Sequence, residues 1–232
     1  MTIPLLVHLT CKAALSTICS VSVHGLPHLE TALSAARTNG LLTLANHIST
    51  LDDPVAWGAL PTKYFLNART IRWTLGASDI MFTNPVFSSF FRRGQVLETV
   101  RGIGKVNQPD AYPQNDGFGQ LPRFKWGIGR VLMEVSSMPT IIPMWLTGFD
   151  SLMPEGRSFP YKYFPRPRKQ LSITFGPPLD LEELDILRKN AVDKTDPSEI
   201  AQIRAEITKV LHDTVEKLGR SVSGNSLRWR AE

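Results

Sequence analysis

Several features that mark other protein classes are scarce or missing in this 232-residue sequence. Its two cysteines, Cys11 and Cys19, lack CxxC spacing, so neither a disulfide framework nor a metal site is expected. No GxSxG motif supplies a nucleophilic serine, and the glycine patterns of nucleotide-binding loops are not satisfied. We therefore expect no nucleotide cofactor and no metal.

Charge is scarce at the N-terminus, where Lys12 is the only formally charged side chain before Glu30. The 17 uncharged residues between them fall short of the roughly 20 apolar residues that span a bilayer. Two interpretations stay open: a helix lying in the membrane interface with Lys12 reaching the headgroups, or an apolar helix packed on the protein's own core. We expect residues 1–30 to be an apolar membrane-interface segment, followed by one main domain over 31–221 and a disordered tail over 222–232.

The overall composition is that of a folded globular protein, with 42% hydrophobic and 20% charged residues. The pI near 9.4 and the net charge of +5 favour anionic partners. Phospholipid headgroups and nucleic acid are the two candidates.

Short apolar runs bounded by turn residues predict strands at 40–45, 71–78, 94–100, 140–149 and 170–176. Helical stretches between them indicate an α/β fold with a mostly parallel sheet flanked by helices. A C-terminal helix is expected to begin at Asp196-Pro197, to bury one apolar stripe, and to end at Gly219.

The stretch "NHISTLDDP" places His47 five residues before Asp52, at the carboxyl end of a predicted strand. An aspartate can hold one imidazole nitrogen while the other takes a proton from a hydroxyl, which suits direct acyl transfer. Such a pair occurs by chance in roughly a quarter of chains of this size, so the spacing alone is a weak signal. The alternative is a loop histidine near two aspartates that stabilise a helix start, with Thr50 as its N-cap.

Four blocks in order, "NHISTLDDP", "ASDIMFT", "GQVLETVRG" and "FKWGIGR", resemble the tafazzin family of the glycerolipid acyltransferase superfamily. The resemblance extends from about residue 46 to 175. It implies that His47 is the catalytic base with Asp52 as its partner, and that Arg101 and Gly102 of the second motif bind the acceptor phosphate. "IIPMW", around Pro143, takes the place of the fourth motif.

The same resemblance implies transfer of acyl chains between phospholipids and lysophospholipids without coenzyme A, with cardiolipin and phosphatidylcholine as partners. Mitochondrial membranes are the implied location, with the protein bound to one membrane face. The family's third motif is missing from its expected place, because "ETVRGIG" continues directly into "KVNQPDAYPQ". About 25 residues, a strand and a helix, are absent from this position. The Pro-Glu-Gly-Arg of "LMPEGRS" comes after the fourth motif and is interpreted as a turn.

These observations leave two functional hypotheses. The first is a membrane-associated transacylase that uses His47 and Asp52. The second is a catalytically silent, shortened acyltransferase-like protein that binds membranes.

One segment, 157–169, combines basic and aromatic residues and contains no acid. Such a composition suits the interface of an anionic membrane, and we expect contact there through Lys162, Arg166, Arg168 and Lys169. Binding of single-stranded nucleic acid is ranked far lower because no RNA-binding signature accompanies the segment, and we expect no nucleic-acid partner. A plain solvated loop is the third interpretation. The phenylalanine-rich stretch 80–93 is a second candidate for interfacial contact.

Overall fold

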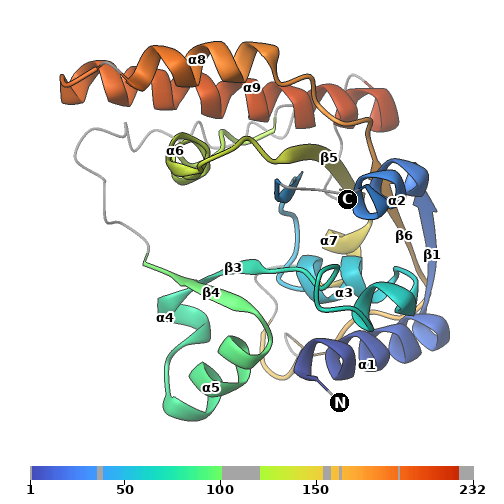
Figure 1. The fold of residues 1–232 in the computed structure, drawn as a ribbon. Helices are drawn as coiled ribbons and strands as arrows, with labels where there is room; N and C mark the ends of the chain where they lie inside the picture. The colour runs from blue at the N-terminus through green and yellow to red at the C-terminus, as the bar shows by residue number, and fades with distance from the viewer. Residues whose placement is uncertain are drawn as a thin grey trace. The chain divides into compact units, whose positions relative to one another are not determined.

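The computed structural model describes residues 2–35, 39–100, 121–153, 158–161, 164–192 and 194–224. The chain divides into two compact units, each built from three separate stretches. Unit 1 consists of Met1–Ser22, Ser49–Ala111 and Gly148–Leu171, and unit 2 of Val23–Ile48, Tyr112–Thr147 and Ser172–Glu232. Helices and strands alternate along the described residues (Figure 1). The predicted α/β class is confirmed.

The strands form two sheets rather than one among the described residues. The larger sheet has the order β1-β6-β5-β2, and its strands are β1 (Cys19–His24), β2 (Leu41–Ala45), β5 (Thr140–Thr147) and β6 (Lys169–Phe175). Strand β2 pairs with β5 in parallel, whereas β6 runs antiparallel to β5. The second sheet is a parallel pair of β3 (Thr74–Ala77) and β4 (Val96–Thr99). All five predicted strands are therefore confirmed, and β1 is an additional strand that the sequence pattern did not indicate.

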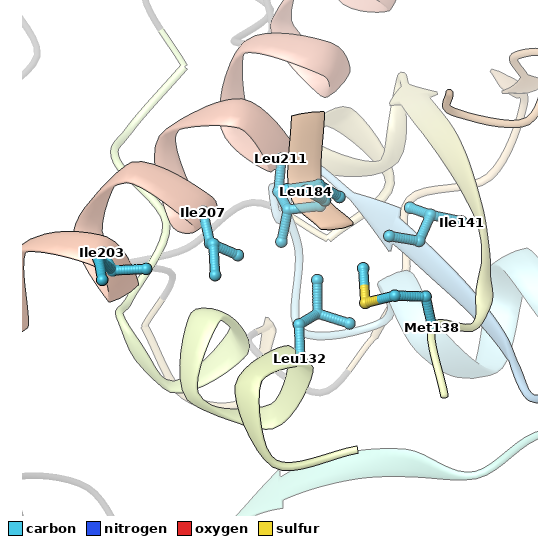
Figure 2. Close-up of a cluster of buried hydrophobic side chains, with 7 residues drawn as sticks. All are labelled: Leu132, Met138, Ile141, Leu184, Ile203, Ile207 and Leu211. Atoms are coloured by element: carbon cyan, nitrogen blue, oxygen red, sulfur yellow. The ribbon is translucent and has the colours of Figure 1, made fainter. Parts of the chain in front are cut away.

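Unit 2 places helices around β2 and β5. They are α2 (Leu26–Ser34), α6 (Gly127–Glu134), α8 (Glu182–Val192) and α9 (Pro197–Ser223). Six consecutive residues of β5 are buried, as expected for a strand covered on both faces. Side chains from α6, β5, α8, α9 and the loop before β5 meet in one apolar cluster (Figure 2), which consists of Leu132, Met138, Ile141, Leu184, Ile203, Ile207 and Leu211.

Helix α9 begins as predicted but ends later. Asp196 is its N-cap, and its Oδ1 accepts the N–H of Ser198 at 3.0 Å. The helix continues past Gly219 to Ser223, so the predicted end is wrong. A Cβ at Gly219 would lie 2.7 Å from ring carbons of the buried Trp145. The glycine is therefore a packing position that lets α9 approach β5.

We expect Gly219→Ala to destabilise unit 2 by about 1–3 kcal/mol, because the added methyl group clashes with a ring that cannot retreat. Trp145 is fixed in place, since its Nε1–H donates to the Ser223 hydroxyl at 3.0 Å. Thermal unfolding measures the effect. Gly127→Ala is the matched control, because a Cβ on that helical glycine would meet nothing within 4 Å. An unchanged melting temperature for Gly219→Ala would contradict the packing role.

Unit 1 contains α1 (Ile3–Ile18), α3 (Asp52–Gly58), the 3-10 helix η1 (Thr62–Phe65), α4 (Ser78–Met81), α5 (Pro85–Arg93) and α7 (Phe149–Leu152). Helix α1 packs against α3 and η1. The stretch expected as one apolar segment is thus a helix, α1, followed by β1 and the start of α2. No helix formed by the described residues is long and apolar enough to cross a membrane.

The inner face of α1 is held by polar contacts. His8 is buried and stacks on Phe65 with 3.9 Å between ring centroids. Its Nδ1 lies 3.2 Å from the Trp57 carbonyl oxygen and its Nε2 lies 3.1 Å from the Thr62 hydroxyl. Burial lowers the pKa of His8 below its ordinary value of 6.5. The ring is therefore neutral at pH 7, donating at Nδ1 and accepting at Nε2.

Lys12 also has a partner within unit 1. Its ammonium group donates to the carbonyl oxygen of Leu60 at 2.9 Å, where the sequence suggested a reach towards headgroups. The outer face of α1 carries exposed Leu6 and Leu9. Contact between that face and a membrane stays a prediction.

Candidate active site

The side chain of Asn46 continues β2 beyond its last main-chain pair, Ala45 opposite Met144. Its Nδ2 donates to the carbonyl oxygen of Leu146 at 2.9 Å, and its Oδ1 accepts the Leu146 N–H at 2.8 Å. Both residues are buried. The amide makes the two hydrogen bonds that a strand residue makes with its backbone, which releases the main chain to turn at His47.

His47 directly follows this anchor and is exposed. It stands at the carboxyl end of a parallel strand, where α/β sheets place their ligands. An exposed imidazole can reach a substrate hydroxyl, whereas a ring enclosed in the core cannot. This position meets the first requirement for a general base.

Asp52 opens α3 in unit 1 and is 5% exposed. Its Oδ2 accepts the Ser49 N–H at 2.9 Å, and its own N–H donates to the Ser49 carbonyl at 3.1 Å. The Ser49 hydroxyl accepts the Leu51 N–H at 3.3 Å and lies 3.4 Å from the Met153 carbonyl oxygen. This reciprocal turn fixes the carboxylate before the first turn of α3.

The predicted N-cap at Thr50 is wrong. Leu51 occupies the cap position and makes no side-chain cap bond, while Thr50 is exposed. The physical reason is local, because Ser49 and Asp52 already bind the N–H groups of this turn.

The adjacent carboxylate, Asp53, is engaged differently. Both of its oxygens accept from the Arg72 guanidinium, with 3.1 Å between Nε and Oδ1. The Arg72 guanidinium also lies over the ring of Trp57, 5.9 Å from its centroid. Two neighbouring aspartates thus have separate partners within unit 1. Asp52 is the one joined to the turn that follows His47.

Several candidate residues lie outside the described residues. They are Arg101 and Gly102 of the second motif, the junction at 104–105 and Lys162. Of the second motif, the structure describes β4 as far as Thr99 and the following Val100. The roles assigned to Arg101 and Gly102 stay predictions.

The described part of the basic and aromatic segment presents its side chains to solvent. Arg166 and Arg168 are exposed, as are Phe159, Tyr161 and Phe164, and Lys169 begins β6. Main-chain bonds hold the segment, since the Arg166 N–H donates to the Leu152 carbonyl at 2.8 Å. No group of His, Cys, Asp and Glu side chains suited to a metal ion occurs among the described residues.

Several known proteins are similar to this chain over much of its length. It is 34% identical over 199 residues to tafazzin of Drosophila melanogaster, covering 78% of this chain and 51% of that protein. It is 30% identical over 237 residues to tafazzin of Saccharomyces cerevisiae, covering 77% of this chain and 62% of that protein. The chain is similar to tafazzins over about three quarters of its length.

The chain spans about half to three fifths of the length of those two relatives. It is also 33% identical over 160 residues to N-acylphosphatidylethanolamine synthase of Arabidopsis thaliana, covering 61% of the chain and 56% of that protein. No protein-family model matches the chain.

A solved structure shares the fold of this chain. The 1-acyl-sn-glycerophosphate acyltransferase PlsC from Thermotoga maritima matches with a TM-score of 0.52 at 17% identity. The match covers 92% of this chain and 78% of that one. The glycerolipid acyltransferase fold expected from the motifs is confirmed.

Two residues of this site were missed by sequence reasoning, namely Asn46 and Ser49. Both belong to the block "NHISTLDDP", so their types were visible in the sequence. Asparagine at a strand end and serine three residues before an aspartate are signals for side-chain bonds to the backbone. Their particular partners, Leu146 and Asp52, become visible only in the structure.

Proposed function

We propose that the chain is a phospholipid–lysophospholipid transacylase in which His47 is the general base and Asp52 its orienting carboxylate. The observation that carries the proposal is the local architecture of "NHISTLD". An exposed histidine follows a doubly hydrogen-bonded strand end, and a buried carboxylate is fixed by the next turn. The similarity to tafazzins agrees with the motif resemblance from which these two roles were predicted.

The chemistry needs no covalent enzyme intermediate. The hydroxyl oxygen of a lysophospholipid attacks the ester carbonyl of a donor phospholipid while His47 accepts the hydroxyl proton. A new ester bond forms, the donor ester bond breaks, and the proton passes from His47 to the departing alkoxide, which becomes the second lysophospholipid. A positioned general base contributes about 10²–10⁴-fold to such a reaction.

The substrate class is supported by the names of the relatives. Tafazzins and a synthase of N-acylphosphatidylethanolamine are both among the proteins that this chain resembles. We propose cardiolipin and phosphatidylcholine with their lyso forms as substrates, by family resemblance. Mitochondrial membranes are the proposed location, with the protein bound to one face.

Membrane contact is supported by the exposed segment around Phe159, Tyr161 and Phe164. Aromatic rings and the cations of Arg166 and Arg168 are a combination suited to an anionic bilayer surface. Each cation near such a surface contributes about 1 kcal/mol. Lys162 is proposed to take part as well.

The missing third motif bears on the origin of this sequence. The Drosophila alignment spans 199 residues but uses 78% of this 232-residue chain, about 181 residues, which leaves about 18 alignment positions without a residue here. We propose that the chain is a shortened product of a tafazzin gene, on the ground that the third motif is missing before residues 104–105. Sequencing of full-length transcripts tests this origin, because a message that uniformly encodes the 104–105 junction removes the explanation by a mistaken gene model.

An acyl-exchange assay tests the proposed function. Purified chain is mixed with a phospholipid and a labelled lysophospholipid, without coenzyme A, and the labelled diacyl product is separated by chromatography. We expect ester exchange above the uncatalysed background. Formation of an N-acylated phosphatidylethanolamine instead of an ester would indicate the activity named for the Arabidopsis relative, N-acylphosphatidylethanolamine synthesis. The absence of both products would reject the transacylase proposal.

A further inference from the structure

Helix α5 exposes an apolar face. Val86, Phe87 and Phe90 are 75%, 52% and 40% exposed, and Ile80 on the preceding helix α4 is also exposed. Phe90 lies one helical turn from both Val86 and Phe87, so the three side chains share one side of the helix. An apolar face of this kind, left open on a folded unit, marks an interaction surface.

Ser88 and Arg92 lie on the opposite side of α5, whereas Arg93, three residues after Phe90 and seven after Val86, lies beside the apolar face. An open groove of about 680 Å³ is lined by Thr83, Asn84, Ser88, Ser89, Arg92 and Arg93, together with Phe82 and Pro85. The Arg92 guanidinium donates to Glu98 at 2.8 Å and lies 5.6 Å from the centroid of the Phe82 ring. Arg93 is exposed. Hydroxyl and guanidinium donors together suit phosphate oxygens.

The helix is therefore amphipathic with both faces open, and it lies next to α4 and β4 within unit 1 (Figure 1). Interfacial helices have this pattern, since apolar side chains enter the boundary of headgroups and acyl chains while arginines on the polar face reach phosphates. Phe91, between the two faces, contacts the rings of Phe82, Phe87 and Phe90 and ties the helix to its surroundings.

We propose that α5 is a docking surface for an anionic phospholipid membrane. Val86, Phe87 and Phe90 enter the headgroup–acyl boundary, and the groove with Arg92 and Arg93 binds lipid phosphates. The positive charge of the arginines complements the negative charge of lipid phosphates, which supports a lipid surface as the partner. The choice of a phospholipid partner rests on the proposed function. Helix α5 is a different stretch of chain from the segment around Phe159.

The test is vesicle flotation with the full chain and serine variants. Val86→Ser/Phe87→Ser removes the two most exposed apolar groups of α5. Ile186→Ser/Val192→Ser on α8 is the matched control, because its two residues are 53% and 78% exposed. We expect the α5 variant to partition at least about tenfold less onto vesicles of phosphatidylcholine with an anionic phospholipid. The control is expected to bind as the unaltered chain does, and both variants to keep its melting temperature.

A charge variant tests the groove. Arg93→Gln is expected to weaken binding about fivefold on anionic vesicles and to leave binding to pure phosphatidylcholine vesicles unchanged. Unchanged partitioning of Val86→Ser/Phe87→Ser would overturn the proposal. The proposal would also be overturned if Val86→Ser/Phe87→Ser changed the oligomeric state, measured by light scattering, without changing vesicle binding. That result would assign the apolar face to contact with a second copy of the chain.

The result of the vesicle test can be separated from the result of the acyl-exchange assay. Vesicle binding is measured without turnover, and His47→Ala is expected to bind vesicles as the unaltered chain does. Loss of acyl exchange in the assay above leaves the flotation comparison intact. Equal flotation of the α5 variant and the α8 control rejects the docking surface whatever the activity.

Discussion

Replacing His47 with alanine is expected to lower the rate of acyl exchange at least about a hundredfold, because no other group is proposed to accept the proton from the attacking hydroxyl. His47 is exposed and follows the end of β2, so its removal opens no cavity in the core. The melting temperature should therefore change little. The measurement is initial rate of labelled diacyl product, compared at equal concentrations of folded protein.

Two aspartate variants sharpen this test. Asp52→Asn keeps an oxygen that can accept the Ser49 N–H, so the turn is preserved while the charge is lost. We expect a rate at least about tenfold below that of the unaltered chain, because the imidazole loses its orienting carboxylate. Asp53→Asn is the matched control, since Asp53 binds Arg72 and has no proposed part in the reaction. Rates for His47→Ala equal to those of the unaltered chain would reject the base assignment.

The elements that could be predicted are those with local signals. Each predicted strand is an apolar run between turn residues, and Asp196-Pro197 begins α9 as such pairs do in many helices. Strand β1 was missed because its six residues follow directly after apolar α1, with no turn residue between them. A continuous apolar stretch does not reveal where a helix changes into a strand.

Glycines illustrate why packing was not predictable. Gly219 resembles a helix end in the sequence, yet it lies within α9 against Trp145. Gly129, in the block "FKWGIGR", lies where a Cβ would be 2.5 Å from both the Arg204 carbonyl oxygen and the Thr208 hydroxyl. These glycines allow α6 and β5 to approach α9. Such a requirement depends on residues about 75 positions away, which a local pattern does not contain.

The sequence suggested the residue types of the candidate site, but not the hydrogen bonds that hold those residues in place. The motif spacing predicted roles for His47 and Asp52, the resemblance added Arg101, and all three roles stay predictions. The supporting bonds made by Asn46 and Ser49 link the motif to β5 and to the loop after α7. Both partners, Leu146 and Met153, lie about a hundred residues further along the chain.

Asn46 gives the largest stability prediction. We expect Asn46→Ala to lower the free energy of unfolding by about 2–4 kcal/mol, because it leaves the N–H and the C=O of Leu146 unpaired in a residue only 1% exposed. For a chain of this length that corresponds to a melting temperature about 5–15 °C lower. Asn46→Asp should lower the free energy of unfolding by a similar amount, because a carboxylate accepts the Leu146 N–H but repels the Leu146 carbonyl oxygen.

The same substitution tests whether Asn46 positions His47. Because the amide holds the last residue before the histidine, its loss should lower kcat for acyl exchange even well below the variant's melting temperature, while KM changes less. Asn67→Ala is the matched control, because the Asn67 side-chain oxygen accepts the Arg69 N–H at 3.0 Å in an exposed turn. A purely structural role would lower the melting temperature and leave kcat of the folded fraction unchanged. Equal stability of Asn46→Ala and Asn67→Ala would instead show that the bonds to Leu146 do not hold the end of β2.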